Sequence, residues 1–259
     1  MLNITPLFSG SSGNSVHIKS DKTEILIDAG VSFRTLSFAL TKIGSSPENI
    51  SAVFVTHEHT DHIAGLEVFC KQYAVPVFMN TKSAEKLYDM GKSPNLCNLI
   101  KTLNPHETAN IKNLCVKAFK TPHDSVGSVG YRIDLEDLSD SFSYCTDIGY
   151  VTRDIAHNVF GSKTVIFEAN HDVSMLKNGR YPYVLKERIL SPYGHLSNED
   201  CSAFLPHLAE NGAKHIILAH LSEDNNTPAI AYETCKKALC LSGYEDVLLE
   251  VAPRSILDR

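Results

Sequence analysis

The stretch VTHEHTDHIAG, residues 55–65, follows an apolar run and gathers ionisable side chains in consecutive positions: His57, Glu58, His59, Asp61 and His62. Each polar group makes burial of this segment more costly unless something binds it. Neutral imidazoles and carboxylates are the ligands that borderline divalent metals prefer. Two alternating histidines at the end of a strand can bind one ion, and the next Asp and His can turn toward a second. We therefore interpret the stretch as the centre of a metal site.

The composition is that of an ordinary globular protein, with 259 residues of which 43% are hydrophobic and 21% charged. This length allows one substantial core, so we expect a single domain over residues 1–259. The apolar runs are shorter than the ~20 residues of a membrane helix, and the first residues lack the basic segment of a signal peptide. The seven cysteines form no CxxC pair and are odd in number, which predicts reduced thiols. We expect a cytoplasmic protein without a membrane partner.

The formal net charge of −6 gives no general attraction for nucleic acid. A polyanionic partner would have to be bound by metal or by a local patch. The best candidate patch is KNGRYPYVLKER, residues 177–188, in which Arg180 and Lys186 are candidate contacts for phosphate. Its tyrosines could also stack on bases. The alternative is an exposed loop that runs into a solvated helix.

Short β-branched runs alternate with helical patterns along the chain, which predicts α/β layers. The expected strands are residues 23–30, 52–59, 75–80, 114–123, 129–135, 141–147, 164–170, 214–222 and 246–252. The expected helices are residues 32–44, 62–73, 83–91, 197–212 and 227–243.

Polar residues recur where these strands end: Asp28, His57, His123, Asp147, Glu168 and His220. In layered α/β folds that edge of the sheet is where ligands bind, because the loops there converge over a rigid floor. We expect the six side chains to share one site.

The motif HEHTDH resembles the HxHxDH signature of the metallo-β-lactamase superfamily, and the resemblance extends over essentially the whole chain. It implies an α/β fold of the αββα sandwich type, with two mixed β-sheets flanked by helices. It also implies two ions with these ligands: His57, His59 and His123 for one, Asp61, His62 and His220 for the other, and Asp147 between them. Asp28 would support the first histidines by hydrogen bonding.

Two divalent ions carry more positive charge than Asp61, Asp147 and a bridging hydroxide neutralise, which suits an anionic substrate. A hydroxide held between two ions is a nucleophile at neutral pH and favours hydrolysis of phosphoesters. The mixed ligands fit zinc or manganese, and iron is a further option.

The segments FEAN and YGHLSN resemble the nuclease branch of the family, as in ribonuclease Z, and imply that Glu168 orients His195 as a proton donor to the leaving alkoxide. Asp61, His195 and Glu168 are thus the expected catalytic residues. Alternatively, His195 merely precedes the helix that starts at Ser197. The early loop FSGSSGNS offers Ser11 and Asn14 as substrate contacts, or is a plain hairpin turn.

Together these motifs most resemble the small stand-alone YycJ (WalJ) exonuclease group. That resemblance implies a nucleic acid substrate, with DNA digested from 5′ to 3′ by the two-metal site. Alternatives are a ribonuclease, a hydrolase of a small thioester or cyclic phosphodiester, and a metal-stabilised binding module. An oxygen-reducing diiron enzyme is disfavoured, because that branch has a carboxylate where this chain has His59. The oligomeric state is not fixed by the sequence.

Several other polar residues match no ligand position. We expect His171 and Asp172 to lie on a loop, although they could line the pocket, and Asp124 could support its neighbour His123. The remaining histidines are interpreted as structural: His17, His106, His157, His207 and His215.

Overall fold

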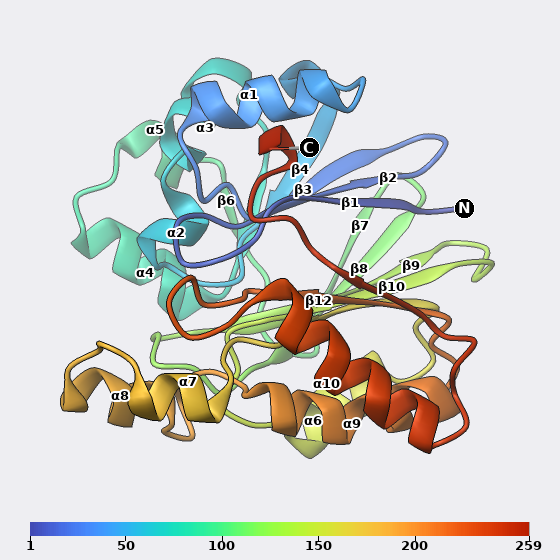
Figure 1. Cartoon of the computed structure of the whole chain (residues 1–259). Coiled ribbons are helices and arrows are strands. Elements are labelled where there is room, and N and C mark those ends of the chain that lie inside the picture. The colour runs from blue at the N-terminus through green and yellow to red at the C-terminus, as the bar shows by residue number, and fades with distance from the viewer. Residues whose placement is uncertain (259) are drawn as a thin grey trace.

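The computed structural model describes residues 1–258, and two mixed β-sheets lie face to face at its centre (Figure 1). The first sheet has the spatial order β1(Asn3–Phe8), β2(Ser15–Lys19), β3(Glu24–Ile27), β4(Ile50–Phe54), β5(Val77–Met79) and β6(Ile100–Thr102). The second has the order β13(Leu248–Val251), β12(His215–Ala219), β11(Thr164–Glu168), β10(Ser141–Cys145), β9(Val129–Leu135), β8(Leu114–Lys120) and β7(Thr108–Ile111).

Helices cover the outer face of each sheet (Figure 1). The first sheet is covered by α1(Phe33–Lys42), α3(Leu66–Tyr73), α4(Thr81–Asp89) and α5(Pro94–Cys97). The second is covered by α6(Arg153–Val159), α9(Asn198–Glu210) and α10(Pro228–Leu241). The short α2(Thr60–Ile63) lies at one end of the sandwich, as do α7(Val173–Asn178) and α8(Tyr183–Ile189), and two 3-10 turns complete the chain, η1(Pro47–Asn49) and η2(Ile256–Asp258). The predicted αββα sandwich is confirmed.

Each sheet is mixed because its strands change direction partway across. In the first sheet β3 to β6 are parallel, and in the second β10 to β13 are parallel. The remaining pairs are antiparallel. All nine strands that the apolar runs predict are present, with ends shifted by a few residues. Strands β1, β2, β6 and β7 were not predicted. For the short edge strands β6 and β7 the reason is that three or four half-exposed residues carry too little apolar signal.

The core has three apolar layers, one between the sheets and one between each sheet and its helices. Burial of these side chains is the main favourable contribution to folding. In the middle layer Phe54 of β4 stacks on Phe78 of β5, with ring centroids 4.9 Å apart. Tyr131 of β9 meets the Phe54 ring edge-on at 5.4 Å. These aromatic contacts join the two sheets directly behind the strand ends.

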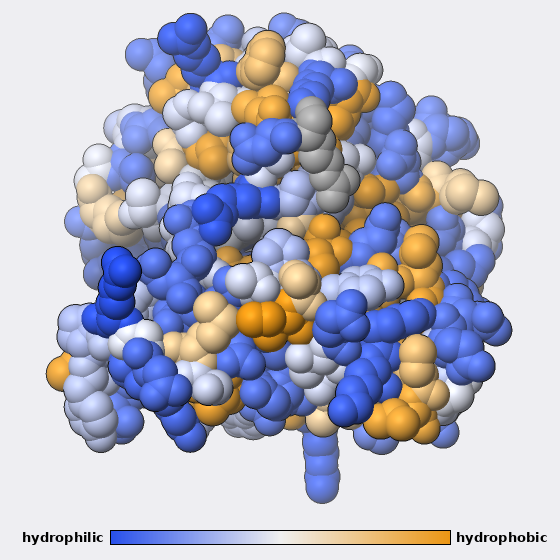
Figure 2. Space-filling model, viewed as in Figure 1, coloured by the Kyte–Doolittle hydropathy of each residue, from blue (hydrophilic) through white to orange (hydrophobic). Residues whose placement is uncertain are grey.

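The surface is mostly polar. Figure 2 shows hydrophilic residues over most of the visible face, with apolar residues in small groups. All seven cysteines are free, and all but Cys115 and Cys240 are buried. Across residues 1–258, the helices are too short or too polar to cross a bilayer.

One buried hydrogen bond fixes the end of β4. The Tyr131 hydroxyl donates to the carbonyl oxygen of Val55 over 2.6 Å, and Tyr131 is fully buried. Val55 lies two residues before His57, so this bond connects the second sheet to the segment that carries the histidines.

Replacing Tyr131 by Phe keeps the ring and removes the hydroxyl. Because the Val55 carbonyl then loses its donor inside the core, we expect the free energy of unfolding to fall by about 1–3 kcal/mol. Urea denaturation followed by circular dichroism measures this change. Tyr183→Phe is the matched control, since that ring is 74% exposed, and should change stability by less than about 0.5 kcal/mol. Equal stability of Tyr131→Phe and the wild type would contradict the role of this bond.

Candidate metal centre

The six polar residues predicted at strand ends lie together at one end of the sandwich. They follow or end strands of both sheets: Asp28 after β3, His57 after β4, His123 after β8, Asp147 after β10, Glu168 at the end of β11 and His220 after β12. None is more than 7% exposed. The two sheets therefore present a single floor of buried donors, as the sequence predicts.

Three of these residues have left-handed backbone conformations, with φ of 61° at Asp28, 57° at Asp147 and 59° at His220. Such conformations are uncommon for residues other than glycine and persist where the surrounding structure imposes them. Here each one turns the chain sharply as it leaves a strand. The glycine after Ala29 is also required, because a Cβ on Gly30 would lie 1.7 Å from the Asp61 carbonyl oxygen.

Four groups of side chains place their potential ligand atoms within 4.8 Å of one another. The groups are His57–His59–His123, Asp61–His62–His220, His57–His62–Asp147 and Asp147–Glu168–His195–His220. The first two are the ligand sets that the family resemblance implies. Asp147 belongs to both of the others, which places it between those sets. Every predicted metal ligand therefore lies in the cluster.

The donor atoms fit divalent ions. His220 Nε2 is buried and has no hydrogen-bond partner among residues 1–258, although Asp147 Oδ1 lies 3.5 Å away. His57 Nε2 and His59 Nδ1 lie only 3.0 Å apart, so both ring nitrogens face the same space. Nitrogen and carboxylate oxygen are the donors that zinc and similar ions take. A bound cation would satisfy His220 Nε2 and could take the two neighbouring ring nitrogens as ligands.

The electrostatics of the site also favour positive charge. Burial opposes charge on His62, but Asp28 and Asp147 outweigh it and raise the pKa of His62 well above its ordinary value. Burial likewise opposes charge on His220, yet Asp147, Asp61 and Glu168 raise its pKa to about 10. Burial lowers the pKa of His57 well below its usual range, so this ligand is a neutral imidazole.

Asp28 holds the histidine segment in place. Its Oδ1 accepts from the Thr56 backbone N–H at 2.8 Å, and its Oδ2 accepts from the Thr56 hydroxyl at 2.9 Å. The same Oδ2 lies 2.7 Å from His62 Nδ1, which leaves His62 Nε2 facing Asp61 and Asp147. Asp28 thus contacts His62 directly and reaches His57 only through Thr56, whose hydroxyl lies 3.1 Å from His57 Nδ1.

Glu168 contacts one candidate metal ligand, His220, and the candidate proton donor, His195. Its Oε1 lies 2.8 Å from His195 Nδ1 and 2.9 Å from His220 Nδ1. Its Oε2 accepts backbone N–H bonds from Ile148 and Leu196. Burial opposes charge on Glu168, but His195 and His220 outweigh it and lower the pKa of Glu168 well below its ordinary value. With Nδ1 engaged, His195 presents Nε2 to a cavity that it lines.

The alternative interpretation of His195 was that it merely precedes a helix. A helix, α9, does begin just after it. Ser197 caps α9 by accepting a hydrogen bond from the Asp200 backbone N–H at 3.0 Å. The cap uses the Ser197 side chain and does not involve the His195 ring. The His195 ring centroid lies 5.1 Å from that of His220.

The cavity beside His195 has a volume of about 170 Å³, and Ser11, Ser222 and Arg188 also line it. Arg188 of α8 forms an ion pair with Asp124, which follows His123. Within the patch of residues 177–188, the sequence analysis named Arg180 and Lys186, and not Arg188, as candidate phosphate contacts. Arg180 is exposed, and Lys186 donates to the carbonyl oxygens of Lys177 and Gly179 at 2.8 Å each.

Asn14 is buried beside the cluster. Its amide lies 3.3 Å from Asp61 Oδ2 and 3.2 Å from His62 Nε2, so it contacts two candidate ligands. Ser11 is exposed and lines the cavity. Substrate contact by Ser11, Asn14, Arg180 and Lys186 stays a prediction.

His171 lies on the connection between β11 and α7, as expected, but it is buried there, with 1% exposed. It forms an isolated bridge with Ser197. Asp172 caps α7 through the Met175 backbone N–H at 2.7 Å. Away from the cluster, His17 pairs with Glu24 and His215 pairs with Glu250, in agreement with structural roles.

Comparison with known proteins gives an independent result. Residues 23–221 match the family described as the beta-lactamase superfamily domain. Exodeoxyribonuclease WalJ of Streptococcus pneumoniae (strain D39) is 36% identical over 231 residues, which cover 88% of this chain and 84% of that protein. Exodeoxyribonuclease YycJ of Bacillus anthracis is 33% identical over 244 residues, which cover 94% and 91%. The metallo-beta-lactamase fold protein YhfI from Bacillus subtilis superposes with a TM-score of 0.72 at 17% identity, covering 98% of both chains.

Replacing Asp28 by Asn preserves size and removes the charge that fixes His62 Nδ1. Because partners of metal-binding histidines orient and activate them, we expect zinc affinity to fall about 10- to 100-fold. Competition with a chromophoric chelator measures the affinity. Asp246→Asn, at an exposed aspartate just before β13, is the control, and its zinc affinity should match that of the wild type. Unchanged affinity in Asp28→Asn would show that Asp28 does not support the centre.

Proposed function

This chain belongs to the beta-lactamase superfamily, and from that premise we propose that it is a metal-dependent phosphodiesterase that degrades DNA from the 5′ end. The relatives named exodeoxyribonucleases, which align over most of the chain, support an exonuclease that acts on nucleic acid. The cluster of imidazoles and carboxylates supports a metal-dependent reaction.

The observation that carries the proposal is the pair formed by His195 and Glu168 beside the metal cluster. His195 Nδ1 is bound to Glu168, so Nε2 is the atom that can donate a proton into the cavity. The leaving oxygen of a nucleic acid is a strongly basic alkoxide, and a positioned proton donor accelerates its departure by about 10²- to 10⁴-fold. A site specialised for lactone or β-lactam hydrolysis does not require that pair.

His57, His59 and His123 would hold one ion, Asp61, His62 and His220 the other, and Asp147 would contact both. When bound, the ions would supply an activated water and neutralise charge on the phosphate. We propose zinc or manganese as the native metal, with iron as a further option, because mixed nitrogen and oxygen donors accept all three.

The chain's own groups divide the remaining work. Arg188 and Ser11 line the small cavity next to His195, where a guanidinium and a hydroxyl can bind phosphate oxygens. His195 gives its proton to the leaving oxygen, and Glu168 stabilises the imidazolium before the transfer. Half-buried Asp61 and buried Asp147 keep the site negative enough to retain cations.

A reducing compartment such as the cytoplasm fits this proposal. All seven cysteines are free, including Cys201 and Cys235, whose sulfur atoms lie 3.8 Å apart without a disulfide.

Duplex DNA labelled separately at its 5′ and 3′ ends tests the activity in Mn²⁺ and in Zn²⁺. We expect mononucleotides to be released progressively from the 5′ end by the wild type and not by Asp61→Ala. Release from the 3′ end would contradict the polarity. Intact DNA in both metals would contradict the nuclease proposal and would favour a small phosphodiester or thioester as substrate.

Replacing His195 by Ala removes the proton donor and leaves every proposed metal ligand in place. We expect cleavage of DNA to slow by about 10²- to 10⁴-fold. A p-nitrophenyl phosphodiester, whose leaving group needs no proton, should be affected far less, and metal content should match the wild type. Equal losses of kcat on the two substrates would remove the proton-donor role.

A further inference from the structure

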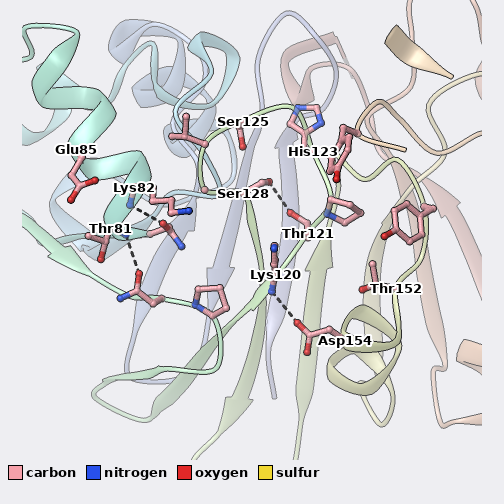
Figure 3. A pocket seen from close by; sticks show the side chains of 18 residues that line it. Thr81, Lys82, Glu85, Lys120, Thr121, His123, Ser125, Ser128, Thr152 and Asp154 are labelled. Atoms are coloured by element: carbon pink, nitrogen blue, oxygen red, sulfur yellow. Dashed lines mark hydrogen bonds between the residues drawn. The ribbon is translucent and has the colours of Figure 1, made fainter. Parts of the chain in front are cut away.

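A groove of about 860 Å³ opens beside the metal centre and is not used by the mechanism above (Figure 3). Helix α4 forms one wall with Thr81, Lys82 and Glu85, and the start of α6 forms the other with Thr152 and Asp154. Segment 120–128 runs between the walls and carries His123 at one end of the groove. The volume lies near the upper limit of small-molecule sites, which is about 1,000 Å³, and the groove is open to solvent.

Two short connections join the groove to the reacting centre. Tyr193 lines the groove and His195 lines the small cavity. Only Gly194 separates these two residues in the chain. The Gly194 carbonyl oxygen lies 3.3 Å from His123 Nδ1. The turn is tight, because a Cβ on Gly194 would lie 2.1 Å from the carbonyl oxygen of Ile189.

Glu58, between the two histidines of the motif, makes the second connection. Its Oε2 accepts from the Ser83 hydroxyl of α4 at 2.9 Å, and its Oε1 accepts from the Val126 backbone N–H at 3.0 Å. Glu58 thus attaches one wall and the floor of the groove to the segment that carries His57 and His59. A ligand in the groove would therefore have a fixed position relative to the metal centre.

The lining offers aromatic rings for stacking and two lysine side chains for phosphates. Tyr150 and Tyr193 are 49% and 60% exposed, so their ring faces are available. Lys82 and Lys120 line the groove together with Glu85 and Asp154, which balance their charge.

Asp154 is already engaged, since it accepts hydrogen bonds from the Lys120 backbone N–H at 3.2 Å and the Asn158 amide at 3.1 Å. The two lysine ammonium groups belong to exposed side chains and are available to phosphates. Ser125 Oγ, also in the lining, is buried and has no hydrogen-bond partner within the described part of the chain. A ligand rich in acceptors would satisfy it.

We propose that this groove binds a single-stranded segment of the nucleic acid next to the scissile phosphate, with bases on Tyr150 and Tyr193 and phosphates against Lys82 and Lys120. The inference rests on the proposed nuclease function and deepens it. Aromatic rings bind the exposed faces of unpaired bases, whereas base pairing and stacking hide those faces in a duplex. The duplex end must therefore open before the strand enters the groove.

Binding of a short, fluorescent, single-stranded phosphorothioate oligonucleotide to the metal-loaded protein tests the proposal by anisotropy. We expect Tyr150→Ala/Tyr193→Ala to weaken binding about 5- to 100-fold, as loss of base stacking does. Tyr150→Phe/Tyr193→Phe keeps both rings and should bind within about two-fold of the wild type, which separates stacking from damage to the fold. Binding by the double alanine variant at wild-type strength would overturn the proposal that the groove binds a single strand.

Phe38→Ala is the matched control, because this aromatic residue is 64% exposed but lies on α1, outside both the groove and segment 177–188. It should bind the oligonucleotide as the wild type does. Loss of binding in Tyr183→Ala alone would place the strand on the basic segment 177–188 and overturn the proposal. Competition by unlabelled duplex as strong as by single strand would overturn the preference for unpaired bases.

The lysines are tested by the salt dependence of binding. Each phosphate contact on a single strand contributes about −0.7 to the slope of log K against log salt, so Lys82→Ala/Lys120→Ala should make the slope shallower by about 1.4. Lys237→Ala on α10 should leave it unchanged. An unaltered slope in the double lysine variant would remove the phosphate contacts. Failure of the wild type to degrade end-labelled DNA is a separate result, which would reject the nuclease function whatever the binding data show.

Discussion

The buried carboxylate of Glu168 is the contact on which the arrangement of the site depends. It receives hydrogen bonds from three separate segments of the chain, at Ile148, at His195 and Leu196, and at His220. Only an ionised carboxylate presents acceptors on both oxygens, so a glutamine would set its amide hydrogens against existing donors. Burial of this charge is costly unless it is hydrogen-bonded. One side chain therefore fixes a candidate metal ligand and the candidate proton donor in a single geometry.

The two sheets supply the rigid floor for that geometry. Strand ends from both sheets meet at one edge, and the Tyr131 bond to Val55 joins the sheets directly behind His57. Left-handed residues at Asp28, Asp147 and His220 turn the chain immediately after three of the strands. Such strain is tolerable because the layers on either side are closely packed. The donors are thereby positioned before any ion or substrate binds.

Much of this could be predicted from short-range patterns. The HEHTDH motif and a polar residue after each of several apolar runs identified the candidate metal ligands as well as Asp28 and Glu168, because alternation and strand ends are local signals. His195 was named only through the family resemblance. The ion pair of Arg188 with Asp124 joins residues 64 positions apart and left no trace in spacing. The groove between α4 and α6 was missed for the same reason, since no local pattern states that these helices face one another. The loop position of His171 was predicted from its polar neighbours, but its burial and its bridge to the distant Ser197 were not.

We propose that these strand ends form a two-ion centre. Anomalous diffraction from crystals grown with Mn²⁺ and recorded at the manganese edge tests it most directly. We expect two peaks per chain, one contacted by His57, His59 and His123 and the other by Asp61, His62 and His220, with Asp147 contacting both. A single peak, or peaks outside this cluster, would contradict the claim.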